Sequence, residues 1–187
     1  IFDYDLYYGA MRRDSNVFGK FRGTQTKTSG QFVIVTANGP FGAGWELGSV
    51  ERFVETNDGS LLWIEGSGAN KVYEPVAGQP GQYTSPVGDF STLVKNADHP
   101  STRSTPDQTV YQYEALRLGS VTDRNGNQTK YIYNGGSLLR KIIDPAGLET
   151  AFEYEALSFG GNRKLRVTSI TDPDGRVTTL DYDDAGN

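Results

Sequence analysis

Apolar and polar residues alternate over short stretches of this chain, and turn-forming residues separate the stretches. Residues 2–7 alternate, residues 31–35 form a β-prone run, and residues 50–55 and 61–65 flank the Asp58-Gly59 pair. Alternation with a period of two is typical of a strand with one buried face, and Asp-Gly between two apolar runs favours a hairpin. The pattern therefore predicts an all-β chain of short antiparallel strands joined by tight turns.

A unit that begins with a turn and ends in a tyrosine recurs in the second half of the chain. Its frame is Asp-x-x-Gly-x-x-Thr-x-Φ-x-Tyr, where Φ is a large apolar residue; three copies fit it, and a worn copy precedes them at residues 106–113. Successive final tyrosines lie 20, 21 and 28 residues apart, and we expect residues 158–162, within the longest interval, to be a loop insertion. The frame is carried by Asp123, Gly126, Tyr131, Tyr133, Asp144, Gly147, Phe152, Tyr154, Asp172, Gly175, Leu180 and Tyr182.

Each unit has the features of a β-hairpin. Asp at the first turn position caps backbone N–H groups, Pro145 and Pro173 preset φ, and Gly tolerates the exit from the turn. After the turn, Thr, Φ and Tyr share one face of a strand. One hairpin cannot bury such an aromatic face alone, so we expect successive hairpins to stack side by side and bury a continuous stripe.

The strand before each turn departs from a simple alternation. Its apolar residues are three positions apart, as in the pairs Leu118 and Val121, Leu139 and Ile142, and Val167 and Ile170. A helix also gives this spacing, but the β-branched residues and the turn signals speak against one. A β-bulge or a bend at this place reconciles the spacing with a strand.

The repeated unit resembles the YD (Rhs) repeat, and residues 41–45, Phe-Gly-Ala-Gly-Trp, resemble the segment that precedes the repeats in Rhs-type proteins. The resemblance covers about residues 39–187 and implies a long, spiralling antiparallel sheet, of which this chain is an arc or a starting segment. In Rhs toxins, toxin complexes and teneurins such repeats wind into a hollow β-shell, which in the bacterial toxins encloses an effector polypeptide. Self-cleaving members use acidic residues near the end of the repeat region; no residue here matches that site.

The organisation expected from these patterns is a β-rich segment at residues 1–104 followed by YD repeats at residues 105–187, together forming one continuous β body. Residues 74–90 are rich in Gly and Pro, so we expect them to be irregular and a candidate linker. The abrupt ends suggest a piece of a larger protein whose repeats are truncated at residue 187.

Composition narrows the possible functions. The 23 glycines, 11 tyrosines and 9 phenylalanines suit short strands and tight turns. A net charge of −5 argues against a nucleic-acid partner. The chain has no cysteine, which excludes disulfides and thiolate chemistry. It also has no run of eighteen apolar residues that would span a membrane as a helix.

Candidate chemistry is sparse, and we assign no catalytic, cofactor-binding or metal-binding residue. His99 lies in a polar stretch, and the spacing of the surrounding residues suggests no nucleophile that it would activate. Aspartates at residues 172–174 and 181–184 carry oxygens suited to Ca²⁺, but their spacing fits no known calcium loop and matches turn capping better. Trp45 and Trp63 are a possible ligand platform for a sugar, with burial in the core as the alternative.

The function that these features favour is architectural and not enzymatic. We expect a structural segment of a large secreted or cell-surface protein, acting in toxin encapsulation and delivery or in cell contact. Its partners are then neighbouring repeats of the same parent chain and an enclosed effector polypeptide. The alternatives are an adhesion module that binds carbohydrate or protein at a surface, and a self-assembling surface subunit.

Overall fold

A computed structural model describes residues 5–8, 32–35, 40–41, 47–65, 70–97, 101–135 and 138–183, with the backbone alone for residues 5–8, 32–35 and 162. These residues form strands and turns and no helix, so the prediction of an all-β fold is confirmed. A small antiparallel sheet pairs β1 (Asp5–Tyr8) with β2 (Phe32–Val35).

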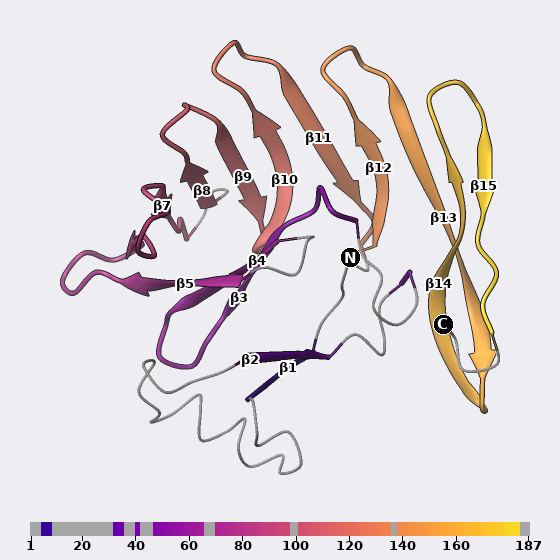
Figure 1. Ribbon diagram of the computed structural model, residues 1–187, viewed down its shortest axis with the longest axis horizontal. Helices are drawn as coiled ribbons and strands as arrows, with labels where there is room; N and C mark the ends of the chain where they lie inside the picture. The colour runs from indigo at the N-terminus through magenta and orange to yellow at the C-terminus, as the bar shows by residue number, and fades with distance from the viewer. Residues whose placement is uncertain are drawn as a thin grey trace.

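All other strands belong to one sheet of 13 strands, in which every pairing is antiparallel (Figure 1). The strands are β3 (Arg52–Glu55), β4 (Leu61–Ile64), β5 (Asn70–Pro75), β6 (Gln82–Thr84), β7 (Thr92–Val94), β8 (Ser101–Ser104), β9 (Val110–Glu114), β10 (Arg117–Thr122), β11 (Gln128–Tyr133), β12 (Leu139–Ile143), β13 (Glu149–Phe159), β14 (Asn162–Thr171) and β15 (Val177–Thr179).

The sheet closes on itself at one end because β10 has three neighbours. Along the order β15–β14–β13–β12–β11–β10–β3–β4–β5–β6–β7–β8–β9, the last strand, β9, pairs again with β10. The start of β10 meets β3, where Arg117 lies opposite Arg52 and the N–H of Phe53 donates to the carbonyl oxygen of Leu116 (2.8 Å). Within this described sheet, β15 is therefore the one strand with a neighbour on a single side.

The turn between β9 and β10 is strained at this junction. Both of its residues, Ala115 (φ 47°) and Leu116 (φ 65°), adopt the left-handed conformation that disfavours side chains with a Cβ. Two residues with positive φ form the hairpin turn whose twist matches that of the strands. The side chain of Leu116 packs against the core and its carbonyl oxygen accepts the bond from Phe53, which holds the strained turn in place.

The three intact repeat units are hairpins stacked side by side, as predicted. They comprise β10 with β11, β12 with β13, and β14 with β15, and their turns lie along one rim of the arc in Figure 1. The worn copy joins β8 to β9, so the boundary between residues 104 and 105 falls at the end of β8 in the same sheet. The predicted hairpin at Asp58-Gly59 is also confirmed, as β3 and β4.

A β-bulge accounts for the three-residue spacing in every unit. The extra residue is Gly119 where β10 pairs with β9, Arg140 where β12 pairs with β11, and Thr168 where β14 pairs with β13. Each bulge lies between the two apolar residues of its strand, so both can face the core despite the odd spacing. The predicted bulge is confirmed three times at the same point of the repeat.

Two predictions about irregular segments are wrong. Residues 158–162 are not a loop insertion but the tip of a lengthened hairpin, in which Gly160 (φ 54°) and Gly161 (φ 82°) connect β13 to β14. Residues 74–90 are not a linker, since they contain the end of β5 and the whole of β6, both of which pair within the main sheet. In the first case the Gly160-Gly161 pair forms a tight turn between two long strands. In the second, the glycine- and proline-rich turns flank β6, which has three residues and is too short to give a clear alternation.

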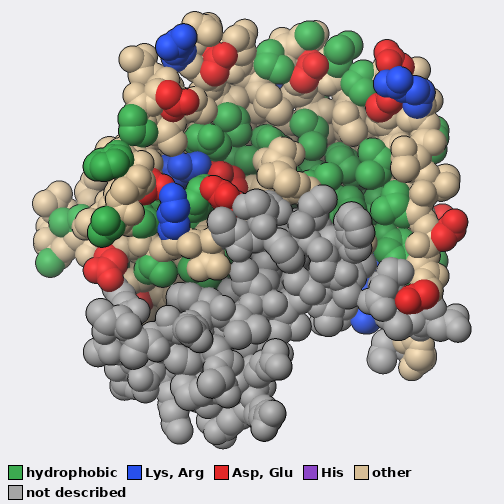
Figure 2. All heavy atoms as spheres, in the orientation of Figure 1, with side chains coloured by type: hydrophobic (Ala, Val, Ile, Leu, Met, Phe, Trp, Pro, Cys, Tyr) green, Lys and Arg blue, Asp and Glu red, His purple; other side chains and the backbone are tan. Residues whose placement is uncertain are grey.

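The hydrophobic core lies along the inner side of the arc, where green side chains gather in Figure 2. It runs from the first hairpin to the last, and the aromatic rings meet edge to face: Phe53 lies 4.8 Å from Tyr113 and 5.6 Å from Tyr73, measured between ring centroids. The buried members are Phe53, Leu61, Trp63, Tyr73, Leu93, Tyr113, Leu118, Tyr131, Leu139, Phe152 and Val167.

Candidate functional site

The repeat turns share one hydrogen-bond pattern. In the first, the side chain of Asp123 accepts bonds from the N–H groups of Asn125 (2.8 Å) and Asn127 (2.9 Å), and the N–H of Gly126 donates to the carbonyl oxygen of Asp123 (3.1 Å). The turns that begin at Asp144 and Asp172 repeat these bonds at distances of 2.8–3.0 Å. The aspartates therefore cap backbone N–H groups, as their spacing predicted.

Glycine is required in these turns by the backbone. Gly126, Gly147 and Gly175 have φ values of 85°, 84° and 80°, which residues with a Cβ rarely adopt.

The capping aspartate is ionised. The hydrogen bond from the Asn127 side chain is the main cause that lowers the pKa of Asp123, so this carboxylate stays ionised across the neutral range.

The same turn occurs twice more, at the hairpin predicted from Asp58-Gly59 and at the worn copy of the repeat. At residues 56–60, the N–H of Gly59 donates to the carbonyl oxygen of Thr56 (2.9 Å), and Asp58 caps the N–H of Ser60 (3.0 Å). At residues 105–109, Gln108 (φ 68°) takes the place of the glycine. Both turns begin with threonine, and their aspartate stands two positions further along, so Thr-x-Asp is the sequence signal that the two turns share.

The tyrosines that end the second and third repeat units tie together the two strands of their own hairpin. The hydroxyl of Tyr154 donates to the carbonyl oxygen of Leu139 (2.7 Å), and that of Tyr182 donates to the carbonyl oxygen of Val167 (2.6 Å). Both carbonyl groups belong to the residue just before a bulge, where the regular ladder is interrupted. The hydroxyl of Tyr133 has no hydrogen-bond partner among the described residues.

The inner faces of the repeats carry the predicted aromatic stripe. Phe152 is 1% and Tyr131 7% exposed, while Tyr133, Tyr154 and Leu180 pack against the core. Burial raises the pKa of Tyr133 to about 12, with a smaller contribution from Tyr131. The stripe therefore joins the hairpins into one core, and its tyrosines do not ionise at neutral pH.

A short N-terminal segment crosses this stripe. The ring of Phe41 meets that of Phe152 edge to face at 6.2 Å, and the carbonyl oxygen of Pro40 accepts a bond from the N–H of Val167 (2.7 Å). Further along, the hydroxyl of Tyr131 donates to the carbonyl oxygen of Ser49 (3.2 Å). Residues before the first hairpin therefore cover part of the face that the repeats present.

A charged cluster is buried inside the closed end of the sheet. One nitrogen of the Arg103 guanidinium donates to both carboxylate oxygens of Glu51 (3.0 and 3.1 Å), and the Tyr113 hydroxyl donates to the same carboxylate. The guanidinium lies between two rings, with its centre 4.1 Å from that of Tyr111 and 4.6 Å from that of Trp63. Arg103 is 4% exposed, so the cluster is a structural link between β8, β9 and the residue before β3.

This cluster corrects the expectation of a ligand platform at Trp63. The side chain is 3% exposed and one face of its ring meets Arg103, so it offers no surface for a sugar. Trp63 is instead a buried core residue, which was the alternative interpretation of its position. Trp45 lies outside the described residues, as does His99.

The remaining candidate chemistry concerns the acidic residues of the described turns. No group of three or more His, Asp or Glu side chains within the described part of the chain is placed to hold a metal ion. The carboxylate of Asp172 caps its own turn and pairs with Arg176 (2.6 Å). The described strands and turns include no helix long and apolar enough to cross a membrane.

Comparison with protein families agrees with this geometry. The family model described as RHS Repeat matches residues 161–187, a stretch that includes β14, the turn at Asp172 and β15. Residues 161–187 are therefore an Rhs/YD repeat. The matched unit has the same turn and the same bulge as the two units before it, so the Rhs repeat extends structurally beyond the matched residues. No curated protein matches the chain as a relative.

Proposed function

We propose that this chain is the closed starting end of a curved β-sheet wall in a large secreted or cell-surface protein. The observation that carries the proposal is the asymmetry of the sheet. At one end β9, β10 and β3 close the ladder on themselves, whereas at the other end β15 has one neighbour. A sheet of this kind begins at the closed end and is extended by further hairpins at β15.

The two faces of the sheet differ in their side chains, as expected for a wall with an inside and an outside. Aromatic side chains line the concave side, and residues 40–41 already occupy part of it. Exposed charged pairs such as Arg140 with Glu153 and Lys141 with Glu149 connect neighbouring strands of the repeats. As the resemblance to Rhs toxins implies, such a wall encloses an effector polypeptide for delivery.

The test is limited proteolysis of the parent protein purified from its source, followed by intact mass measurement. We expect a protease-resistant body that retains a separately cleaved C-terminal polypeptide, with this chain's peptides inside the resistant fraction. A single uncleaved chain without protected cargo would exclude encapsulation.

A second candidate function, binding at a cell surface, is favoured by one exposed loop. Val87 and Phe90, between β6 and β7, are 105% and 78% exposed, and Phe90 has the unusual φ of 59° for an aromatic residue. Large apolar side chains held in solvent suit contact with another protein. If this loop binds a cell surface, we expect Phe90→Ser to abolish attachment of the parent protein to its target cells and to leave its melting temperature unchanged. Unaltered attachment would exclude a binding role for the loop.

A further inference from the structure

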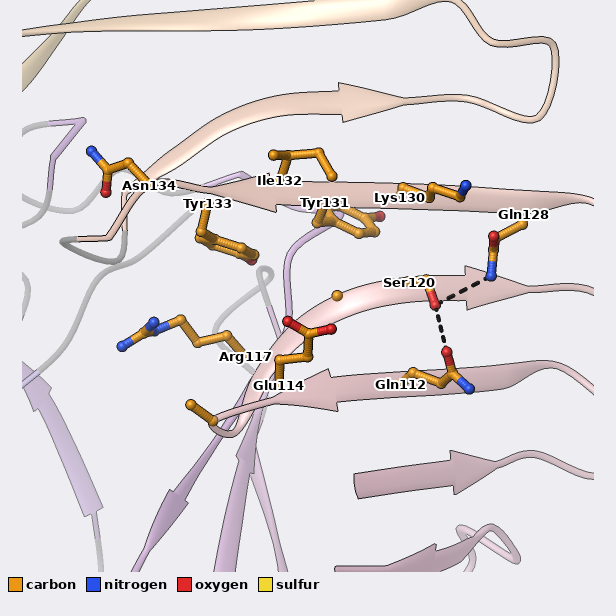
Figure 3. Close-up of a pocket in the computed structure, with 12 residues that line it drawn as sticks. Gln112, Glu114, Arg117, Ser120, Gln128, Lys130, Tyr131, Ile132, Tyr133 and Asn134 are labelled. Atoms are coloured by element: carbon orange, nitrogen blue, oxygen red, sulfur yellow. Dashed lines mark hydrogen bonds between the residues drawn. The ribbon is translucent and has the colours of Figure 1, made fainter. Parts of the chain in front are cut away.

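The loop between β11 and β12 joins the first repeat hairpin to the second, and it is capped like a repeat turn. Asn134 lies just past the end of β11 (Figure 3). Its N–H donates to the carbonyl oxygen of Leu138 (2.9 Å), and its side-chain oxygen accepts a bond from the N–H of Leu138 (2.9 Å). Asp144 and Leu148 make the same two bonds at the tip of the next hairpin (3.0 and 2.9 Å). Asn134 therefore stands where a repeat turn has its capping aspartate.

The residue that follows the cap is different in this loop. After Asp144 and Asp172 the chain continues with proline, which has no N–H, whereas Asn134 is followed by Gly135. Gly135 is exposed, does not have a positive φ, and has nothing within 4 Å of an added Cβ. Its N–H donates to no acceptor among the described residues. A backbone nitrogen thus lies beside an amide side chain without bulk around it and without a bond that holds it.

An asparagine in this setting can modify itself. The nitrogen of the following residue attacks the carbonyl carbon of the side chain, a C–N bond closes a five-membered succinimide, and the side-chain nitrogen leaves as ammonia with the proton of the attacking N–H. Water then opens the ring at either carbonyl group and leaves aspartate or isoaspartate. The attacked oxygen gains negative charge in the transition state, and the N–H of Leu138, which already bonds this oxygen, stabilises that charge as an oxyanion-hole donor does.

In the described part of the chain, the other glycines that follow Asn or Asp have their nitrogen occupied. The N–H of Gly126 donates to the carbonyl oxygen of Asp123 (3.1 Å), so it cannot turn toward the side chain of Asn125 while the turn is intact. The N–H groups of Gly59 and Gly175 are held in the same way (2.9 Å each). Breaking one such bond slows the attack by about tenfold. The fold therefore distinguishes Asn134 from the other candidates, although the sequence alone does not.

We propose that Asn134 is a self-modification site, which converts in the folded chain to aspartate and isoaspartate through attack by the nitrogen of Gly135. Water is the sole co-reactant. Each event replaces a neutral amide by a carboxylate in a chain whose net charge is already −5. Isoaspartate also lengthens the backbone between β11 and β12, where consecutive repeats are joined. The proposal holds whether or not the chain begins a wall.

Peptide mapping by mass spectrometry follows the reaction over time in the full chain at mildly alkaline pH, which deprotonates more of the attacking nitrogen. Trypsin separates the two asparagines to be compared, because it cuts after Arg124, Lys130 and Arg140. We expect Asn134 to convert about tenfold faster than Asn125 in the folded chain, and at a similar rate in the chain unfolded by urea. Equal rates in the folded chain, or an Asn134 that stays intact, would overturn the proposal.

A variant at the next residue removes the attacking group. Gly135→Pro has no N–H at this position and copies the order of the Asp144 turn, so it should abolish the conversion of Asn134. The open space around Gly135 and its ordinary φ favour retention of the fold, which thermal melting confirms. Gly135→Ala is the matched control, since it keeps the N–H and should retain the reaction at a reduced rate. Continued conversion in folded Gly135→Pro would overturn the mechanism.

The reaction should also be transferable to a repeat turn. The double variant Asp144→Asn with Pro145→Gly supplies the amide and the attacking N–H at the tip of the second hairpin, where the N–H of Leu148 makes the same bond to the side chain (2.9 Å). We expect residue 144 to convert at a rate similar to that of Asn134 in the same folded molecule. An intact residue 144 would show that the cap and the glycine do not suffice, and would overturn the assignment.

Discussion

Tyr133 and Tyr154 occupy the same position in successive repeats, but their hydroxyl groups have different surroundings. Tyr154 donates to the carbonyl oxygen of Leu139, whereas Tyr133 has no acceptor among the described residues. We expect Tyr154→Phe to lower the free energy of unfolding by about 1–2 kcal/mol, because it leaves a carbonyl group at the bulge without its partner. Tyr133→Phe should be nearly neutral. Urea denaturation of the two variants measures the difference.

The comparison separates the hydroxyl from the ring. Tyr133→Ala removes the ring from the aromatic stripe and should cost roughly 3–5 kcal/mol, as large-to-small core substitutions do. If Tyr154→Phe and Tyr133→Phe lowered stability equally, the bond to Leu139 would not be what distinguishes the two positions.

Asp89 makes the stability of the fold depend on pH. Its side chain is 6% exposed and accepts bonds from Lys71 (2.9 Å), Tyr73 (2.9 Å) and Ser91. Burial alone would raise its pKa, but the bonds from Ser91, Lys71 and Tyr73 outweigh burial and lower the pKa from 3.8 to about 2.

Because the folded-state pKa is lowered, the carboxylate stabilises the fold fully above the ordinary pKa and loses this effect as the pH falls from about 4 to about 2. We expect the free energy of unfolding of the wild-type chain to fall by up to about 2 kcal/mol in this window through Asp89. In Asp89→Asn that decline should be shallower, measured by denaturation at a series of pH values. An identical decline in both proteins would assign the acid sensitivity to other groups.

At the scale of the element, the five-residue turn is the unit that the chain reuses. Gln108 stands where the intact repeats have glycine and adopts φ 68°, a conformation that is strained for residues with a Cβ. Gln108→Gly should therefore raise the free energy of unfolding by roughly 0.5–1 kcal/mol, the relief of strain less the greater flexibility of glycine in the unfolded chain.

The reverse change tests the same argument in an intact turn. Gly147 has φ 84° and nothing within 4 Å of an added Cβ, so Gly147→Ala changes the backbone preference without a clash and should cost about 1–2 kcal/mol. Gly135→Ala is the matched control, since Gly135 has the same open surroundings and no positive φ. Equal losses at Gly147 and Gly135 would contradict the role assigned to φ.

Local features of this fold could be predicted from the sequence, and long-range ones could not. The Asp-x-x-Gly turns, the strands that flank them and the bulge between Leu118 and Val121 follow from spacing within about ten residues, where turn chemistry and alternation dominate. The contact of Arg117 with Arg52 joins residues from different halves of the chain and has no local signal. The burial of Arg103 could not be predicted either, because its partner Glu51 precedes it by 52 residues and both side chains are charged.

At the scale of the whole molecule, the sheet has two unlike ends, and association should follow the open one. β15 exposes all three of its residues and has β14 as its one neighbour in the described sheet, so its outer edge presents unpaired backbone groups. Unpaired edges recruit further strands. We expect the isolated chain to associate reversibly through β15, as measured by sedimentation velocity at increasing protein concentration.

The variant Val177→Lys places a charge on this edge and should keep the chain monomeric, because edge lysines oppose pairing between strands. Leu148→Lys is the matched control: Leu148 is also an exposed apolar residue (51%, against 60% for Val177), but it lies in the turn between β12 and β13, away from the free edge. Association that persists in Val177→Lys but is lost in Leu148→Lys would place the contact on the rim of turns instead. A chain that stays monomeric without any substitution would mean that the free edge of β15 does not recruit strands, and the proposal of a wall that grows from this end would lose its physical basis.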